Sequence, residues 1–262
     1  MRPIRLVETL AQSLAHSLAQ RVPIATGSRA HLTLGVDVDA RLGAGMTAAG
    51  LHDLYAQAPD DAAAAAAFAL LLTLVAASAG PTVWIRPRRA ERVAGMLYAE
   101  GIVELGGDPD ALLLVMPDDD RDVLRAADDG VRHAGSGGSG GAGAVIVELH
   151  GRAPLYDLTA SRRLALAARA RGVLVLMLRV GGVPVASAAE TRWSIAAAPA
   201  LPLAADAPGH PAFDLTLLRH RGGLPGFQTR LEWNRDTRSF ASLSGRASAA
   251  SVSRTDVRAR AA

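Results

Sequence analysis

The stretch Ala144-Val-Ile-Val-Glu-Leu149 decides the fold, together with Asp157–Arg171 and Val173-Leu-Val-Leu-Met-Leu178, which follow it. The first and last of these segments are short and almost wholly apolar, which is typical of strands buried on both faces of a parallel sheet. The segment between them is predicted to be a helix, and the last strand is expected to extend to Val180. The unit is therefore strand, helix, strand.

The same alternation precedes this unit along the chain. We predict three earlier strands and three helices, at Leu51–Ala56, Thr82–Arg86, Ala111–Met116, Asp61–Ala79, Arg89–Glu100 and Asp118–His133. Asp60 is expected to cap the first of these helices, and Gly80-Pro81 to end it. The predicted fold class is α/β, with a mostly parallel sheet covered by helices on both faces.

The pattern changes from about Thr191, where strand-like segments follow one another without helices between them. They are Arg192–Ala198, Phe213–His220 and Gln228–Trp233. The last two are separated by Gly222-Gly-Leu-Pro-Gly226, a sequence typical of a turn. We therefore expect antiparallel strands at the edge of the sheet.

Glycine interrupts the chain in two further places. Leu34–Met46 is predicted to be a structured loop, because its glycines prevent a regular element from continuing. Gly135–Gly143 contains only glycine, serine and alanine, which is typical of a flexible linker.

The two ends of the chain differ from its middle. Leucines recur every fourth residue in Met1–Arg21, at Leu6, Leu10, Leu14 and Leu18, which predicts an amphipathic helix. This segment lacks the unbroken apolar run of a signal peptide, so we expect a cytoplasmic protein. Serine, alanine and arginine dominate the end of the chain. The predicted organisation is a helix and linker over residues 1–30, a core over 31–240, and a flexible tail over 241–262.

One helical segment is apolar enough to raise the alternative of a membrane span. Ala62–Ala79 is nearly all apolar, but most of it is alanine and no arginine lies close to either end. A buried helix is the interpretation that we favour over a membrane span.

Composition excludes several kinds of chemistry. The chain has 262 residues, and its 28 basic and 25 acidic residues give a net charge of +3. All the basic residues are arginine, which excludes a Schiff-base lysine and the lysine of a phosphate-binding P-loop. Cysteine is absent, which excludes disulfides and thiolate nucleophiles.

The loop after the first core strand, Ala56-Gln-Ala-Pro-Asp-Asp61, is where an α/β nucleotide-binding domain would hold phosphates. It contains no glycine and no lysine, and its two carboxylates would repel a triphosphate. We therefore predict neither nucleotide nor any other cofactor there.

Acidic residues form two further candidates. Asp118-Asp-Asp120 with Asp122 could be imagined as a metal site, but acids in a first helical turn complement the helix dipole, and we favour that interpretation. Glu148 ends an apolar strand at the edge where such sheets place functional groups. With His150 it could form a catalytic or a purely structural pair.

Two arginine clusters could meet nucleic-acid phosphates or an acidic partner surface, and could equally be solvated faces. They are Arg86, Arg88, Arg89 and Arg92, and Arg162, Arg163, Arg169 and Arg171.

The order of the segments resembles the RecA-like core. The resemblance lies in Leu34-Gly-Val-Asp-Val-Asp-Ala-Arg-Leu-Gly-Ala-Gly leading into Leu51-His-Asp-Leu-Tyr, then Gly80-Pro-Thr-Val-Trp-Ile, Leu105-Gly-Gly-Asp-Pro-Asp-Ala-Leu-Leu-Leu and Ala144-Val-Ile-Val-Glu. It implies a P-loop NTPase-type sheet, and it places Glu148 where that family has its metal-associated acid.

Within that family the chain is similar to ImuA, a bacterial damage-inducible mutagenesis protein in a superfamily that also includes SulA-related proteins. The similar segments are Asp157-Leu-Thr-Ala-Ser-Arg-Arg-Leu164, Glu190-Thr-Arg-Trp-Ser-Ile-Ala-Ala-Ala-Pro199, and Leu217-Leu-Arg-His-Arg-Gly-Gly-Leu-Pro-Gly226 followed by Leu231-Glu-Trp233. Departures from an active ATPase accompany this likeness. The phosphate loop is degenerate, and Arg86-Pro-Arg-Arg89 stands where the family carries its catalytic glutamate.

The resemblance implies a non-catalytic accessory protein of SOS-induced translesion DNA synthesis. Its expected partners are an ImuB-like protein and an error-prone DNA polymerase, with RecA and DNA as further candidates and no membrane. Candidate contacts are Leu10, Leu14, Arg86, Arg88, Arg89, Arg162, Arg163 and Arg169. A SulA-like cell-division inhibitor, or a RecA-like ATPase or DNA-binding protein, are the alternatives.

Overall fold

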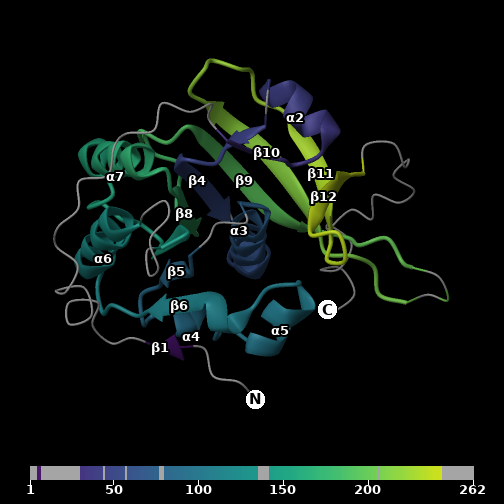
Figure 1. The fold of residues 1–262 in the computed structure, drawn as a ribbon, viewed down its shortest axis with the longest axis horizontal. Helices are drawn as coiled ribbons and strands as arrows, with labels where there is room; N and C mark the ends of the chain where they lie inside the picture. The colour runs from purple at the N-terminus through teal and green to yellow at the C-terminus, as the bar shows by residue number, and fades with distance from the viewer. Residues whose placement is uncertain are drawn as a thin grey trace, which may run out of the picture.

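A computed structural model of the chain describes residues 5–6, 30–43, 45–56, 58–76, 80–134, 142–203, 205 and 207–243. Within these ranges, ten strands form one sheet in the order β1-β6-β5-β7-β8-β4-β9-β10-β11-β12 (Figure 1). A second, two-stranded sheet pairs β2 (His31–Leu32) with β3 (Met46–Thr47). The order of strands places β8 and β4 in the middle of the large sheet.

Parallel pairing extends across the first seven strands of that order, from β1 to β9. These strands are β1 (Arg5–Leu6), β6 (Leu112–Val115), β5 (Thr82–Ile85), β7 (Ala144–His150), β8 (Leu174–Val180), β4 (Gly50–Ala56) and β9 (Thr191–Ala198). Residues of β4, β7 and β8 are buried almost throughout, because helices cover both faces. The five parallel strands predicted between Leu51 and Val180 are therefore confirmed. Arg5–Leu6, within the segment predicted as a helix, is a strand, and β9, predicted among the antiparallel strands, is parallel to β4 and antiparallel to β10.

The remaining strands are antiparallel, as the sequence predicts. β10 (Ala212–His220) pairs with β9 and with β11 (Gln228–Asn234). A further strand, β12 (Ser239–Ser242), pairs with β11 through Trp233 and Phe240. This strand was not predicted, and it includes the first two residues of the predicted tail. Phe240 packs its ring at 4.9 Å from that of Trp233, so this strand closes one end of the core.

Helices lie on both faces of the sheet (Figure 1). α3 (Ala62–Ala76) packs on β4, β8 and β9, whereas α6 (Asp120–His133) and α7 (Leu158–Arg171) lie side by side on the opposite face. The segment Pro59–Ala76 is long and apolar enough to cross a membrane, and half of it is buried against the rest of the chain. Phe68 and Leu71 are fully buried in it. This burial agrees with a core helix.

The segment predicted as a loop over Leu34–Met46 contains a helix, α2 (Val36–Leu42). Its glycines lie at the ends of the helix, where Gly43 takes the left-handed conformation that closes a C-terminus. Asp39 accepts a hydrogen bond from the Leu34 backbone N–H at 2.9 Å. The glycines therefore mark the boundaries of a short helix, and the loop prediction was wrong.

The helix predicted over Arg89–Glu100 is two short helices, α4 (Ala90–Ala94) and α5 (Ala99–Glu104). Gly95, with a φ of +73°, ends the first of them. Asp60 does not cap α3, because Pro59–Asp61 forms a 3-10 turn that leads directly into Ala62.

The acidic run before α6 is a helix cap, as we favoured over a metal site. The Asp119 side chain accepts a hydrogen bond from the Asp122 backbone N–H at 2.8 Å. Asp118 and Asp120 form ion pairs with Arg88 and Arg89.

Candidate functional site

Two polar clusters lie at the carboxyl end of the parallel strands, on opposite faces of the sheet. Successive side chains of a strand point to opposite faces, so every second residue belongs to the same cluster. On β7, Val147 packs on the α6 and α7 side, which places Glu148 on the α3 side. On β8, Met177 packs on the α6 and α7 side, which places Arg179 on that side too.

The cluster on the α3 face centres on Glu148, which is 1% exposed. Its carboxylate accepts a hydrogen bond from Trp84 Nε1 at 3.1 Å, and its other oxygen lies 2.6 Å from His150 Nε2. Arg86 Nε lies 3.1 Å from Glu148 Oε2 as an ion pair without hydrogen-bond alignment, while Arg86 Nη2 donates to the Ala90 carbonyl. Glu148 is therefore fully committed to neighbouring side chains.

The loop before α3 also contains a buried carboxylate, that of Asp61. Asp61 is 8% exposed, and its Oδ1 accepts a hydrogen bond from the Ala197 backbone N–H of β9 at 3.1 Å. An acidic side chain therefore occupies the start of the helix on which an α/β domain would hold a phosphate. This geometry agrees with the charge argument made from the sequence of that loop.

The cluster on the opposite face rests on Asp53 of β4, which is fully buried. Asp53 accepts hydrogen bonds from Tyr156 Oη at 2.7 Å and from Ser187 Oγ at 2.5 Å, and Arg192 Nε lies 3.4 Å away. Burial raises the pKa of Asp53 above its usual range, and the Ser187, Tyr156 and Arg192 contacts oppose that shift. The desolvated Tyr156 hydroxyl, beside Asp53, has a pKa raised well above its ordinary value.

Arg179 of β8 lies over the rings of Tyr55 and Tyr156 and is 2% exposed. Its guanidinium is 5.7 Å from the ring centroids of both Tyr55 and Tyr156, and its Nη2 donates to the Gly151 carbonyl at 3.1 Å. Gly182 packs so closely that an added Cβ would come within 2.9 Å of Arg179 Nη2.

A cleft of about 650 Å³ opens beside Arg179, between the start of α7 and the segment after β8. It is lined by Arg152, Ala153, Pro154, Tyr156, Asp157, Leu158, Arg179, Gly181, Val183, Val185 and Ala186. A cleft of this size with mostly apolar walls and a few polar groups is the usual form of a ligand-binding site.

A buried histidine lies on β4 next to Asp53. His52 Nε2 is 2.9 Å from the Thr47 carbonyl, and its Nδ1 is 2.8 Å from Thr191 Oγ1. Because a carbonyl only accepts, Nε2 carries the proton and Nδ1 accepts from the threonine hydroxyl. Burial lowers the pKa of His52 from 6.5 to about 4, so the ring is neutral at physiological pH.

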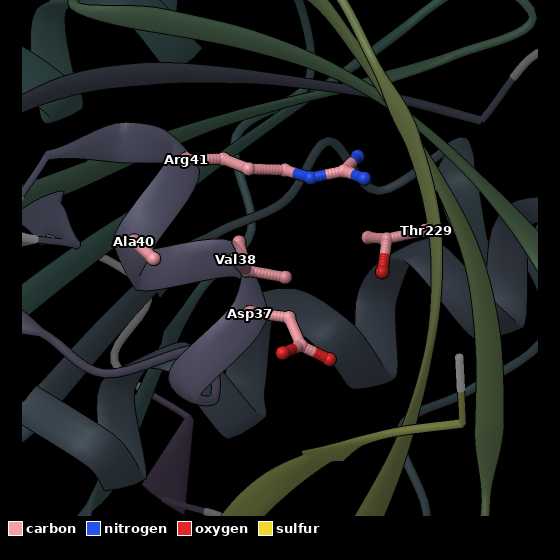
Figure 2. A pocket seen from close by; sticks show the side chains of 5 residues that line it. All are labelled: Asp37, Val38, Ala40, Arg41 and Thr229. Atoms are coloured by element: carbon pink, nitrogen blue, oxygen red, sulfur yellow. The ribbon is translucent and has the colours of Figure 1, made fainter. Parts of the chain in front are cut away.

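A smaller pocket of about 310 Å³ lies between α2 and β11. Figure 2 shows Asp37 and Arg41 on the helix facing Thr229 across it. Arg41 lies 5.0 Å above the Phe227 ring, so its guanidinium already has an aromatic partner.

The arginines singled out from the sequence are dispersed in the structure. Arg86 is buried at 3% exposure against Glu148, which corrects its grouping with exposed arginines. Arg88 pairs with Asp118, which precedes α6, and Arg89 pairs with Asp120, the first residue of α6. On α7, Arg163 lies 2.5 Å from Asp128, Arg169 pairs with Glu190, and Arg162 is exposed. Leu10 and Leu14 lie outside the described residues.

Sequence reasoning missed Asp53, Tyr156 and Arg179, which form the floor and wall of the cleft. One signal was present, because Asp53 and Arg179 are charges inside otherwise apolar strands. Tyr156 stands in a loop, and only the fold brings its hydroxyl to Asp53 from a distance of 103 residues.

Comparisons with known proteins identify the fold. A crystal structure of the RadB recombinase superposes with a TM-score of 0.51 over 80% of this chain and 98% of that chain, at 16% identity. No protein-family model matches the chain, and no curated protein matches it. The similarity therefore shows a RecA-like fold, with its mostly parallel sheet and antiparallel C-terminal strands.

Proposed function

We propose that this chain is a non-catalytic accessory protein of SOS-induced, error-prone translesion DNA synthesis. It acts by contact, with an ImuB-like protein and an error-prone polymerase as partners, and with RecA or DNA as further ones. The translesion role rests on the similarity to ImuA segments, and the non-catalytic role rests on the site geometry. A cytoplasmic location follows from the same proposal.

The Arg86–Glu148 pair is the observation that carries the non-catalytic part of the proposal. Glu148 occupies the place that the resemblance gives to a metal-associated acid, yet its oxygens are engaged by Trp84, Arg86 and His150. A carboxylate that is 1% exposed and already paired with an arginine is poorly placed to hold a metal–nucleotide complex. Asp61 at the start of α3 adds a negative charge where the phosphates would lie.

The segments that resemble ImuA lie together in the fold, which supports treating them as one functional unit. The Arg221 backbone N–H donates to the Glu190 carbonyl at 2.7 Å, and Glu190 also pairs with the Arg169 side chain. Ser161 of α7 accepts a hydrogen bond from the Ala188 backbone N–H at 3.1 Å, just before β9.

Calorimetric titration of the full chain with ATP and magnesium tests the non-catalytic part. We expect no heat of binding at micromolar nucleotide. Binding with a micromolar Kd would replace this proposal with the RecA-like ATPase alternative.

Affinity capture of tagged protein from cells treated with a DNA-damaging agent tests the partners. We expect translesion polymerase components among the proteins identified by mass spectrometry. A variant with Leu10→Asp and Leu14→Asp is the matched comparison, because the leucine stripe is a candidate contact. Recovery of the division-ring protein in place of polymerase components would contradict the proposal and favour the SulA-like alternative.

A further inference from the structure

The cleft on the α7 face joins a buried cation to exposed aliphatic side chains. Arg179 is 2% exposed, whereas Leu158 is 45%, Val185 is 41% and Val183 is 77% exposed. Large aliphatic side chains gathered around a cleft mark an interaction site, because they gain by leaving water.

Arg179 has more donors than partners. Its Nη2 donates to the Gly151 carbonyl, but its Nε and Nη1 are buried and find no hydrogen-bond acceptor among the described residues. Neighbouring carboxylates are committed elsewhere. Asp157 caps α7 by accepting from the Ala160 backbone N–H at 2.7 Å, and Asp53 holds Tyr156, Ser187 and Arg192. A buried guanidinium with unused donors is unfavourable until an anion reaches it.

The side chains that line the cleft indicate which kind of anion fits it. Grooves that bind single-stranded nucleic acid combine several cations with exposed aromatic rings on which bases stack. Here the two aromatic rings, Tyr55 and Tyr156, are buried beneath Arg179. The exposed rim is aliphatic at Leu158, Val183 and Val185, with one further cation, Arg152, and one acid, Asp157. A carboxylate flanked by apolar groups fits this combination better than a phosphodiester does.

We propose that this cleft binds a peptide segment of a partner protein, in which a carboxylate bonds to Arg179 and flanking apolar side chains pack on Val183, Val185 and Leu158. The inference rests on the proposed function, since it assumes a protein that acts by contact, and it adds the place and the chemistry of that contact. A desolvated arginine at the centre of an apolar rim is the arrangement of an interface hot spot.

Selection from a phage-displayed library of random 12-residue peptides on the immobilised full chain tests the site without reference to DNA damage. We expect enriched peptides with aspartate or glutamate beside aliphatic or aromatic residues. Fluorescence anisotropy with a synthetic copy of an enriched peptide then gives the affinity. Arg179→Met is expected to weaken binding about tenfold or more, because it removes charge-assisted hydrogen bonds.

Two further variants keep the result interpretable. Val183→Asp changes an exposed position, so it should fold normally and still weaken binding by placing a negative charge on the rim. Arg125→Met on α6 removes an arginine whose side chain is 70% exposed, and it should leave the affinity unchanged. Enriched peptides without an acidic residue, or equal affinity for wild type and Arg179→Met, would overturn the proposal.

A single-stranded 12-nucleotide DNA and the ImuB-like protein complete the test. DNA that binds in an Arg179-dependent manner, while peptides do not, would also overturn the peptide proposal. If the ImuB-like protein binds wild type and Arg179→Met equally, the proposed function stands and this site is wrong. If selected peptides bind through Arg179 but the ImuB-like protein does not bind, the site stands and the proposed partner is wrong.

Discussion

Arg86 follows β5 and Arg179 lies near the end of β8, so both stand at the carboxyl end of the parallel strands. Both are buried, but their surroundings differ. Arg86, on the α3 face, lies 3.1 Å from the carboxylate of Glu148. Arg179, on the α7 face, has two aromatic rings and one carbonyl but no carboxylate partner within the described ranges. The first site pairs its cation with an anion, although Arg86 Nε makes no hydrogen bond. Arg179 has no anion among the described residues, and its buried Nε and Nη1 find no acceptor beside the cleft.

This difference separates structural from functional use of a buried charge. A compensated pair can hold a fold together but offers little to a ligand, because each charge already has an opposite charge beside it. An uncompensated buried cation lowers the stability of the free protein, and the protein regains that stability when an anionic ligand binds to the cation. On the α3 face the buried charge at the strand ends is thus paired with Glu148, whereas the cleft beside the unpaired cation lies on the α7 face.

The largest expected effect comes from breaking the compensated pair. Arg86→Met leaves the Glu148 carboxylate buried beside Trp84 without its cation, and we expect the free energy of unfolding to fall by about 3–5 kcal/mol. Urea denaturation followed by tryptophan fluorescence measures this loss. Combining Arg86→Met with Glu148→Gln removes both charges and keeps an acceptor for Trp84 Nε1. The double variant should therefore recover more than half of the free energy of unfolding that Arg86→Met loses. A single variant as stable as wild type would show that the pair does not matter.

His52 shows a third solution, in which a buried ionisable group is kept neutral. Because its pKa falls from 6.5 to about 4, the unfolded chain takes up a proton first as the pH is lowered. The stability that His52 contributes is therefore complete above pH 6.5 and is lost as the pH falls to about 4. The loss amounts to about 3 kcal/mol.

Asp53, whose pKa is raised, has the opposite slope, so the two residues must be separated. The difference between the urea midpoints of wild type and His52→Gln, measured between pH 4 and 7, isolates the contribution of His52, because Asp53 is present in both proteins. The urea midpoint of the wild type should rise more between pH 4 and pH 7 than that of His52→Gln. Parallel curves would contradict a lowered pKa at His52.

Tyr156→Phe tests the floor of the open site. The substitution removes one of the hydrogen bonds to the buried Asp53 carboxylate and leaves those from Ser187 and Arg192. We expect a loss of about 1–2 kcal/mol in urea denaturation. Tyr98→Phe is the matched control, because Tyr98 is 64% exposed and should not affect stability. Equal effects of the two substitutions would mean that the Asp53 network contributes little.

The comparison also explains which features could be predicted from the sequence. Continuous apolar runs such as Val173–Leu178 fix the strands, because residues buried on both faces have no alternative to the core. The helix over Val36–Leu42 escaped prediction, because its glycines at positions 35 and 43 are boundaries that look like interruptions until backbone angles are known. Glu148 could be located as the end of a strand, but its partner Arg86 could not, because their proximity depends on the order of strands.

Arg179→Met has the smallest expected effect on stability and the opposite sign. Methionine fills a similar volume between Tyr55 and Tyr156 without a charge to desolvate, so we expect the free energy of unfolding to rise by about 1 kcal/mol. The same substitution at Arg86 destabilises, because a carboxylate is left behind there. Urea denaturation of both variants in one buffer checks the pair of signs. Destabilisation by Arg179→Met as large as that by Arg86→Met would mean that Arg179 is already compensated in the free protein, and the argument for an anionic partner at the cleft would fail with it.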